Sequence, residues 1–279
     1  MPETWTADIR RFETIDSTNR YLLDEARAGA PEGVVAVADH QTAGRGRLGR
    51  SWEAPPGANL LLSVLLRPDT DPGDRHLATT AVALAAVDAI GELGVPGPSG
   101  ASVVSVKWPN DLVDPTGRKL AGVLAESDLA PSGPGRGAGP GPERGPGPVV
   151  PDPVVVGIGI NVNWPADDAD LPPGLRGLAV SLRQLAGRTV DREALLDALL
   201  AALGPRVTCL GTPEGRLRLA GDLLASCSTV GTRVRVDLPD GSFEGTATGI
   251  SPEGHLVVAT GEATRTVVAG DVVHVRPGS

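Results

Sequence analysis

The 279-residue sequence contains no run of apolar residues close to the ~18 that are needed to cross a bilayer. Its first ten residues, MPETWTADIR, also lack the apolar core of a secretory signal peptide. These two absences predict a cytoplasmic protein without a membrane segment.

Cysteine is scarce as well: Cys209 and Cys227 match no zinc-binding spacing, and we expect them to be two reduced thiols.

Lysine is almost missing from the sequence. Of 25 basic residues only Lys107 and Lys119 are lysine, and both lie within the segment 106–122. Lysine carries a compact charge on a flexible stem, whereas arginine carries a planar fork, so the two are not interchangeable at a precise site. The formal net charge of −9 argues against a broad basic surface for nucleic acid, but it leaves room for a local basic pocket.

The chain is long enough for one large domain and one small domain. We expect the large domain to span residues 1–228, because helical and strand patterns mix over this stretch. The helices are predicted at 17–28, 76–93, 191–203 and 214–225, and the strands at 34–38, 59–66, 103–107, 119–126 and 154–160. This mixture indicates an α/β or α+β domain with a mixed or mostly antiparallel sheet, in which a hairpin joins the strands at 103 and 119.

The last part of the chain, 229–279, has a different pattern. Short strands at 233–238, 242–250, 255–260, 264–268 and 272–275 alternate with Gly, Pro and Asp turns, which predicts a small β-barrel. A Gly/Pro tract at 130–153 has too few apolar residues to offset the entropy of ordering it. We therefore expect a disordered surface insertion there and assign it no function.

Glycines and arginines alternate in the loop 44–50, directly after a predicted strand. Its G-x-G-x-x-G spacing is that of a dinucleotide-binding turn, but such a turn opens a helix. The residues that follow, 51–56, include two prolines and cannot begin a helix promptly. We interpret the segment as a mobile loop whose Arg45, Arg47 and Arg50 fold over a phosphate or carboxylate, since guanidinium forks suit such oxygens.

The segment 106–111 ends another predicted strand. Pro109 keeps Trp108 extended, and we expect Trp108 to serve in packing. Asn110 and Asp111 then present an amide and a carboxylate at the end of the strand. Asp111 could help hold Mg²⁺, order the arginine loop, or only form a local turn with its own backbone, and the sequence leaves these alternatives open.

Two further strands bring polar side chains next to glycine. Lys119 stands among small and apolar neighbours, so its ammonium is predicted to point into a site, and Gly122 allows close backbone approach. Asn161 follows a strand that contains Gly157 and Gly159, and its amide can both donate to and accept from an adenine edge.

Six segments occur in the order found in one enzyme family: 16–19 (DSTN), 41 with 43–52 (Q and AGRGRLGRSW), 57–60 (GANL), 107–112 (KWPNDL), 119–122 (KLAG) and 157–161 (GIGIN). Together they resemble the biotin–protein ligases, in the short form without an N-terminal DNA-binding domain. The resemblance spans most of residues 14–165. It implies an α+β fold with a mixed sheet flanked by helices, similar to class II synthetases, and an SH3-like barrel at the C-terminus.

The resemblance also implies the site residues. Biotin would be bound by residues of four segments: Ser17, Thr18, Asn19, Gln41, Arg45, Gly46, Arg47 and Lys119. ATP or the adenylate would be bound by Arg45, Arg47, Arg50, Trp52, Asn110, Asp111 and Asn161. Lys119 and Arg47 would be catalytic, and Asp111 would hold Mg²⁺.

The implied reaction has two steps, with MgATP and biotin as substrates and no tightly bound prosthetic group. Biotin would form biotinyl-5′-AMP, and a lysine of the biotin carboxyl carrier domain of a carboxylase would then accept the biotin. Three alternatives stay open: a lipoate–protein ligase, a biotin-binding regulatory protein without ligase activity, and a DNA-binding repressor. Only fifteen residues precede Asp16, too few for a winged-helix domain, so we expect no DNA binding.

Overall fold

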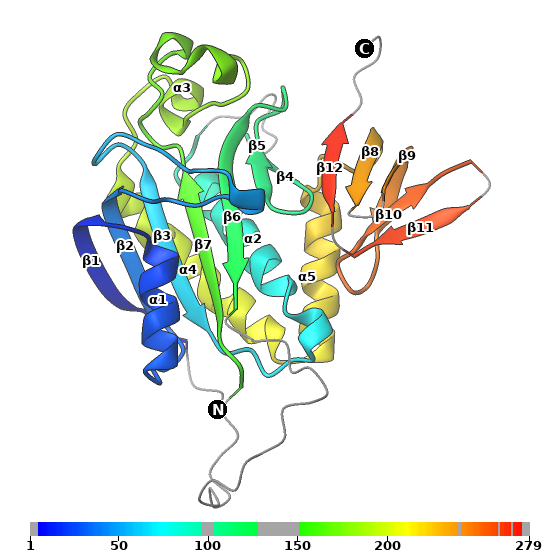
Figure 1. The fold of residues 1–279 in the computed structure, drawn as a ribbon, viewed down its shortest axis with the longest axis horizontal. Helices are drawn as coiled ribbons and strands as arrows, with labels where there is room; N and C mark the ends of the chain where they lie inside the picture. The colour runs from blue at the N-terminus through cyan, green and yellow to red at the C-terminus, as the bar shows by residue number, and fades with distance from the viewer. Residues whose placement is uncertain are drawn as a thin grey trace, which may run out of the picture.

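The structure is a computed structural model that describes residues 5–95, 103–127, 151–238, 241–261, 263–268 and 270–274. Residues 130–150 of the predicted insertion at 130–153 lie outside the described ranges. Figure 1 shows a large sheet with helices on both faces and, beside it, a smaller sheet formed by the C-terminal part of the chain. None of the helices in the described ranges is long and apolar enough to cross a membrane.

The large sheet has seven strands in the order β1-β2-β3-β7-β6-β5-β4. The strands are β1 (Asp8–Ile15), β2 (Val34–Gln41), β3 (Leu60–Leu66), β4 (Ser105–Lys107), β5 (Asp111–Val113), β6 (Lys119–Glu126) and β7 (Val154–Ile160). Only β1 and β2 pair in parallel, so the predicted mixed sheet is confirmed. The predicted hairpin between 103 and 119 is instead a three-stranded meander, because β5 lies between the two expected strands.

Three long helices cover one face of this sheet: α2 (Leu77–Glu92), α4 (Arg192–Leu210) and α5 (Pro213–Ser226). The alanines of α2 are all buried, because their small side chains allow α2 to pack between α4 and the sheet. On the other face, α1 (Thr18–Arg27) packs on β2, β3 and β7. Since α1 packs mainly on these strands, much of this face at β5 and β6 is left for a site.

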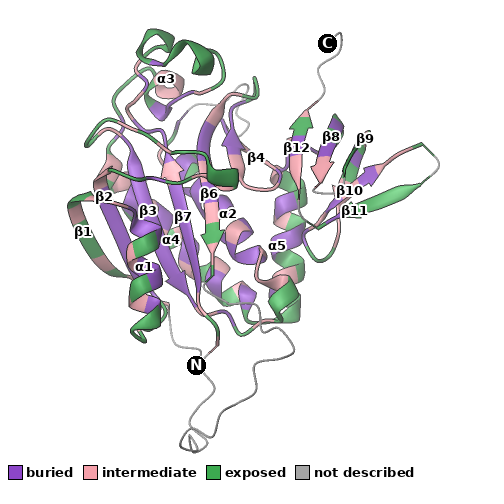
Figure 2. Cartoon of the chain, in the orientation of Figure 1, coloured by how far each residue is buried: buried purple, intermediate pink, exposed green. Residues whose placement is uncertain are grey.

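Shorter elements connect the large ones. The helix α3 (Leu182–Ala186) follows β7, and the single 3-10 turns are η1 (Arg47–Gly49), η2 (Pro72–Asp74), η4 (Asp168–Asp170) and η5 (Pro173–Leu175). Figure 2 shows that β3 and β7 in the middle of the sheet are buried, whereas β1 at its edge is largely exposed. This contrast follows from their sequences, which are apolar in β3 and β7 and mostly polar in β1.

The C-terminal strands form an antiparallel sheet in the order β11-β10-β9-β8-β12. They are β8 (Arg233–Leu238), β9 (Gly241–Ile250), β10 (Leu256–Ala259), β11 (Thr264–Val267) and β12 (Asp271–His274), so an all-β unit is confirmed. Trp108 joins this sheet to the large one: its backbone N–H donates to Thr229 Oγ1 at 3.0 Å and its indole N–H to the Gly254 carbonyl at 3.3 Å. Trp108 is 4% exposed, which confirms its predicted role in packing.

Candidate active site

A cavity of about 1000 Å³ opens on the α1 face of the large sheet. Every residue that the sequence singled out for binding or catalysis contributes to its wall. These residues are Ser17, Thr18, Asn19, Gln41, Arg45, Gly46, Arg47, Arg50, Trp52, Asn110, Asp111, Lys119 and Asn161. The fold therefore brings the predicted segments together, whereas the ligand that each side chain contacts stays a prediction.

Three glycines form the floor of the cavity. A Cβ atom at Gly157 would lie 2.1 Å from Asn19 Oδ1, and one at Gly159 would lie 2.5 Å from Trp52 Cε2. A Cβ at Gly122 would lie 3.1 Å from Lys119 Nζ. The missing side chains allow an amide, an indole and an ammonium to lie directly on the sheet.

A hydrogen-bonded chain of polar groups lines one end of the cavity. Thr18, the first residue of α1, donates its backbone N–H to Gln41 Oε1 at 2.8 Å, and its hydroxyl lies 2.7 Å from Ser63 Oγ. Ser63 in turn donates to Asn19 Oδ1 at 2.6 Å. The Thr18 hydroxyl also donates to Gln41 Oε1 at 3.1 Å, so Gln41, Thr18, Ser63 and Asn19 form one continuous chain of hydrogen-bonded groups.

The same chain continues to the arginine loop. Asn19 Nδ2 donates to Glu126 Oε2 at 2.7 Å, and Glu126 Oε1 lies 3.1 Å from Arg45 Nη1. Glu126 at the end of β6 thus connects the helix start at Asn19 with Arg45. No sequence motif marks Glu126, since nothing in its local sequence indicates that a distant loop and helix meet there.

Two backbone hydrogen bonds close the arginine loop, residues 44–52. The Trp52 N–H donates to the Gly44 carbonyl at 3.0 Å, and the Gly46 N–H donates to the Arg50 carbonyl at 2.6 Å. Between these bonds lie the turn η1 and Leu48, which is 71% exposed and has a φ of 57°. No helix follows the loop directly in the described part of the chain, which agrees with our reading that this is not a dinucleotide-binding turn.

Two loop arginines reach the C-terminal sheet. Arg47 donates to Asn110 Oδ1 at 2.8 Å and to the Gly270 carbonyl at 3.0 Å, and Arg50 lies 3.1 Å from Asp271 Oδ2. The C-terminal sheet therefore contributes groups to the site. No sequence pattern indicates Gly270 or Asp271, because both contacts join residues more than 200 positions apart.

Lys119 lies in the middle of the cavity. Its Nζ is 2.8 Å from Asp111 Oδ1 and 5.5 Å from the centre of the Trp52 ring. An ammonium above the face of an indole is attracted by its negative π-surface. Asp111 thus contacts Lys119, and no loop arginine pairs with it among the described residues. Its predicted role in holding Mg²⁺ stays a prediction.

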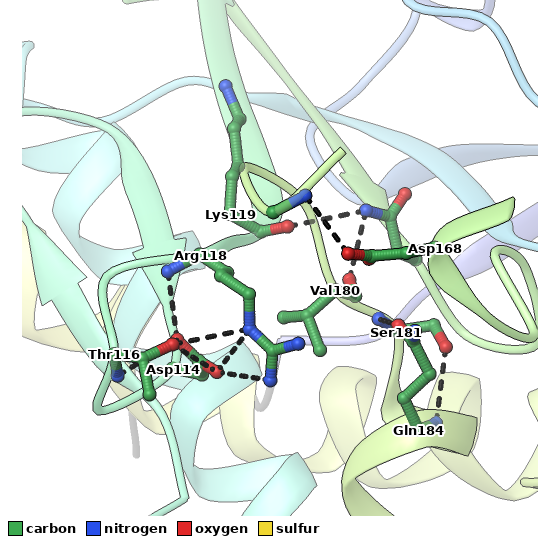
Figure 3. Close-up of polar contacts among 10 residues, drawn as sticks. Asp114, Thr116, Arg118, Lys119, Asp168, Val180, Ser181 and Gln184 are labelled. Carbon is green, nitrogen blue, oxygen red and sulfur yellow. Dashed lines mark hydrogen bonds and ion pairs between the residues drawn. The ribbon is translucent and has the colours of Figure 1, made fainter. Parts of the chain in front are cut away.

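The hairpin before Lys119 depends on Asp114, a second residue that no sequence motif marks. Asp114 is 2% exposed and accepts hydrogen bonds from Thr116 and from the backbone and side chain of Arg118. Burial alone would raise the pKa of Asp114, but these hydrogen bonds and the Arg118 charge outweigh it and hold the pKa below its usual value. Figure 3 shows this cluster, with the Lys119 side chain extending away from it.

The amide of Asn161 is engaged within the protein. Its Nδ2 donates to the Val180 carbonyl at 3.1 Å and to the Lys119 carbonyl at 3.5 Å, and its Oδ1 accepts from Asn59 at 3.2 Å. In this structure Asn161 therefore braces the backbone of Lys119. A contact between its amide and a nucleotide stays a prediction.

Two parts of the chain match known protein families. Residues 11–132 match the biotin/lipoate A/B protein ligase family, and residues 229–275 match the biotin protein ligase C-terminal domain. The biotin–[acetyl-CoA-carboxylase] ligase of Mycobacterium tuberculosis is 36% identical over 93% of this chain and 86% of its own length. The chain belongs to the biotin protein ligase family.

Two further biotin protein ligases support this assignment. The biotin–[acetyl-CoA-carboxylase] ligase of Paracoccus denitrificans is 32% identical over 91% of this chain and 94% of its own. The structure of the biotin protein ligase from Aquifex aeolicus in complex with biotin and ATP has a TM-score of 0.73 and 25% identity, and covers 96% of this chain and 99% of that chain. The resemblance inferred from the sequence motifs and the predicted fold class are therefore confirmed.

Proposed function

We propose that this chain forms biotinyl-5′-AMP from biotin and MgATP and transfers the biotin to one lysine of a biotin carboxyl carrier domain. The observation that carries the proposal is the position of Lys119. Its ammonium lies over Gly122 in the same cavity as the polar chain of Thr18 and Gln41. A cation is thus available for the carboxylate of biotin, beside a polar pocket that suits its neutral ring.

The ureido ring of biotin has one carbonyl acceptor and two N–H donors. The end of the cavity formed by Ser17, Thr18, Asn19 and Gln41 offers hydroxyls and amides that match both kinds of group. We assign the biotin ring to this end, with Arg45, Gly46 and Arg47 closing over it. At Gly157 the missing side chain lets Asn19, one of these polar groups, lie directly on the sheet.

The first step needs positive charge, because a carboxylate must approach a triphosphate. Lys119 and Arg50 each face a carboxylate, of Asp111 and Asp271, and Arg47 faces two carbonyl oxygens. We propose that substrate oxygens replace these partners when biotin and ATP bind, so that the same cations stabilise the charge of the transition state. Trp52 would then cover the adenylate, and the closed loop would protect it from water.

Mg²⁺ enters this scheme with ATP as part of the substrate. The described residues contain no group of three or more His, Cys, Asp or Glu side chains arranged to hold a metal ion. Mg²⁺ is commonly held by one or two carboxylates together with substrate phosphates, and Asp111 can supply one carboxylate. We therefore retain Asp111 as the residue that holds Mg²⁺.

The chemistry balances without a covalent enzyme intermediate. In the first step a biotin carboxylate oxygen bonds to the α-phosphorus, and the bond to pyrophosphate breaks. In the second step the acceptor lysine, as a neutral amine, attacks the carbonyl carbon, AMP leaves, and the amine loses a proton. The main contribution of the protein is to hold the reacting groups in position within one cavity.

The proposal is tested by incubating the protein with MgATP and either radiolabelled biotin or radiolabelled lipoate, and separating the products. We expect labelled biotinyl-AMP and pyrophosphate. Lipoyl-AMP without biotinyl-AMP would show a lipoate ligase instead. Binding of biotin without release of pyrophosphate would show a binding protein that lacks ligase activity.

The acceptor is tested separately. After incubation with biotin, MgATP and a cell lysate, the biotinylated proteins are captured and identified by mass spectrometry. We expect a carboxylase subunit with a carrier domain, modified on one lysine. Biotin on many unrelated proteins would contradict transfer to a specific domain.

A further inference from the structure

Four residues form a row across the floor of the cavity, one from each of four adjacent strands. Gly159, Gly122, Asp111 and Lys107 are successive register partners from β7 to β4. Register partners project from the same face of a sheet, and adjacent strands are about 4.8 Å apart. The row therefore runs from the indole over Gly159, past the Lys119 ammonium and Asp111, to Lys107 on the edge strand.

Lys107 differs from the other cations of the cavity because its ammonium has no partner among the described residues. Arg45, Arg47, Arg50 and Lys119 each contact a carboxylate or a carbonyl oxygen. The Lys107 ammonium makes no hydrogen bond or ion pair with any residue that the structure describes, although Lys107 is the register partner of Asp111, whose carboxylate pairs with Lys119. A half-buried ammonium without a counter-charge is unfavourable, so an anionic ligand at this position would stabilise it.

We propose that Lys107 binds the pyrophosphate that leaves when the adenylate forms, an inference that rests on the proposed function. In phosphoryl chemistry the attacking and the leaving oxygen lie on opposite sides of the phosphorus. The carboxylate arrives from the end of the cavity at Thr18 and Gln41. The leaving group then points the other way along the row, toward Asp111 and Lys107.

The chemistry of that end of the cavity favours Lys107 as the donor. Asp111 has the same sign of charge as a phosphate and can only approach it through Mg²⁺. Thr232 and Ser228 also line the cavity, but their hydroxyls donate to backbone carbonyls, of Thr229 at 2.7 Å and of Val106 at 3.3 Å. Burial and the nearby Lys107 ammonium both lower the pKa of His274, so its ring is neutral and adds no positive charge.

Loss of a pyrophosphate-binding group should affect only the first of the two reaction steps. Pyrophosphate takes part in adenylate formation but not in transfer from the finished adenylate. In Lys107→Met, we expect single-turnover formation of biotinyl-AMP to be about 100-fold slower, as for the loss of one group that stabilises developing charge. Transfer from preformed biotinyl-AMP to the carrier domain should match wild type, and Lys107→Arg should recover part of the first step.

Inorganic pyrophosphate with Mg²⁺ provides a direct binding probe. It should inhibit Lys107→Met about 10-fold more weakly than wild type, while the control Arg233→Met, at an exposed ion pair with Glu244, should behave as wild type. Unchanged adenylate formation in Lys107→Met, or a loss confined to the transfer step, would overturn the inference. A wild-type protein that forms no biotinyl-AMP would overturn the proposed function itself, and the inference with it.

Discussion

The indole of Trp52 lies directly on the backbone of Gly159. A methyl group at position 159 would come within 2.5 Å of Trp52 Cε2 and 2.6 Å of its Nε1. Real side chains do not approach so closely, so the ring can occupy this position only because residue 159 has no side chain. The Nε1 of Trp52 is buried in this arrangement and has no hydrogen-bond partner among the described residues. The indole is thus positioned by its packing against Gly159. In this position it forms one wall of the proposed adenylate site.

Gly159→Ala tests this contact. The added methyl group must displace the indole, which we expect to slow biotinyl-AMP formation by about 100-fold, since a shift of about 1 Å in a positioning group can cost that much. The thermal midpoint of unfolding should change little, because the ring belongs to a surface loop that can move. Single-turnover formation of biotinyl-AMP and a melting curve measure the two effects.

Gly249→Ala is the matched control, since a Cβ at Gly249 would meet no atom within 4 Å. It makes the same chemical change on a strand of the C-terminal sheet and should leave both measurements unchanged. Wild-type rates in Gly159→Ala would show that the position of the indole does not matter for the first step.

Glu126→Gln tests the link between the arginine loop and the biotin pocket. The amide can still accept a hydrogen bond from Asn19, but it removes the charge that faces Arg45. We expect the KM for biotin to rise about 10-fold, equivalent to about 1.4 kcal/mol, while the KM for ATP changes little. Steady-state kinetics with each substrate varied in turn provide the comparison.

Glu244→Gln serves as the control for this prediction, because Glu244 pairs with Arg233 on an exposed part of the C-terminal sheet. It should leave both KM values as they are. Equal changes in the two KM values of Glu126→Gln would indicate a general loss of structure rather than a link to the biotin end.

Asp114→Asn tests the hairpin that positions Lys119. The pKa of Asp114 in the folded protein is held below the ordinary value of 3.8, so the ionised carboxylate stabilises the fold above that pH. We expect the variant to lose about 2 kcal/mol of unfolding free energy near neutral pH, as for hydrogen bonds to a charged group. The difference from wild type should shrink as the pH falls below about 4, where the wild-type carboxylate also becomes protonated.

Denaturant unfolding at a series of pH values gives this difference directly. Asp8→Asn is the control, because Asp8 pairs with Arg10 in an exposed ion pair that should contribute less than about 1 kcal/mol. A difference between wild type and Asp114→Asn that stays constant from neutral to acidic pH would contradict a role for the charge of Asp114.

The elements that the sequence predicted well are those with a strong local signal. The bounds of β6 and β7 agree with the prediction, because both strands are short apolar runs bordered by polar or turn residues. In contrast, β1 has the polar sequence DIRRFETI and becomes a strand only by pairing with β2. Its partner strand lies about 25 residues away along the chain, so no local pattern could indicate it.

The end of α4 shows a different limit. A helix was predicted to stop at 203, before Gly204 and Pro205, but α4 continues to Leu210. Val207 and Leu210 on the added part are buried in the core, so packing outweighs the cost of proline inside the helix. Local preferences are a weak guide where tertiary contacts oppose them.

The site was predictable as a set of segments but not as a network of contacts. Motif residues such as Gln41 and Lys119 could be chosen because they belong to recognisable segments. Glu126 and Asp271 could not, because their roles depend on which distant arginine the fold brings to them. The same holds for the contacts of Asn161 with the backbone of Lys119 and Val180, whereas its predicted contact with a nucleotide stays a prediction.

Lys119 is the residue that we propose enables the activation of biotin for transfer to a carrier domain. The most direct measurement is mass spectrometry of a purified biotin carboxyl carrier domain after incubation with biotin, MgATP and either wild-type protein or Lys119→Ala. We expect wild type to add the mass of one biotin to one lysine, and Lys119→Ala, folded as judged by its melting curve, to add none. A carrier that wild type leaves unmodified would refute the proposed ligase activity, and one that Lys119→Ala modifies at a near-normal rate would refute the role of Lys119.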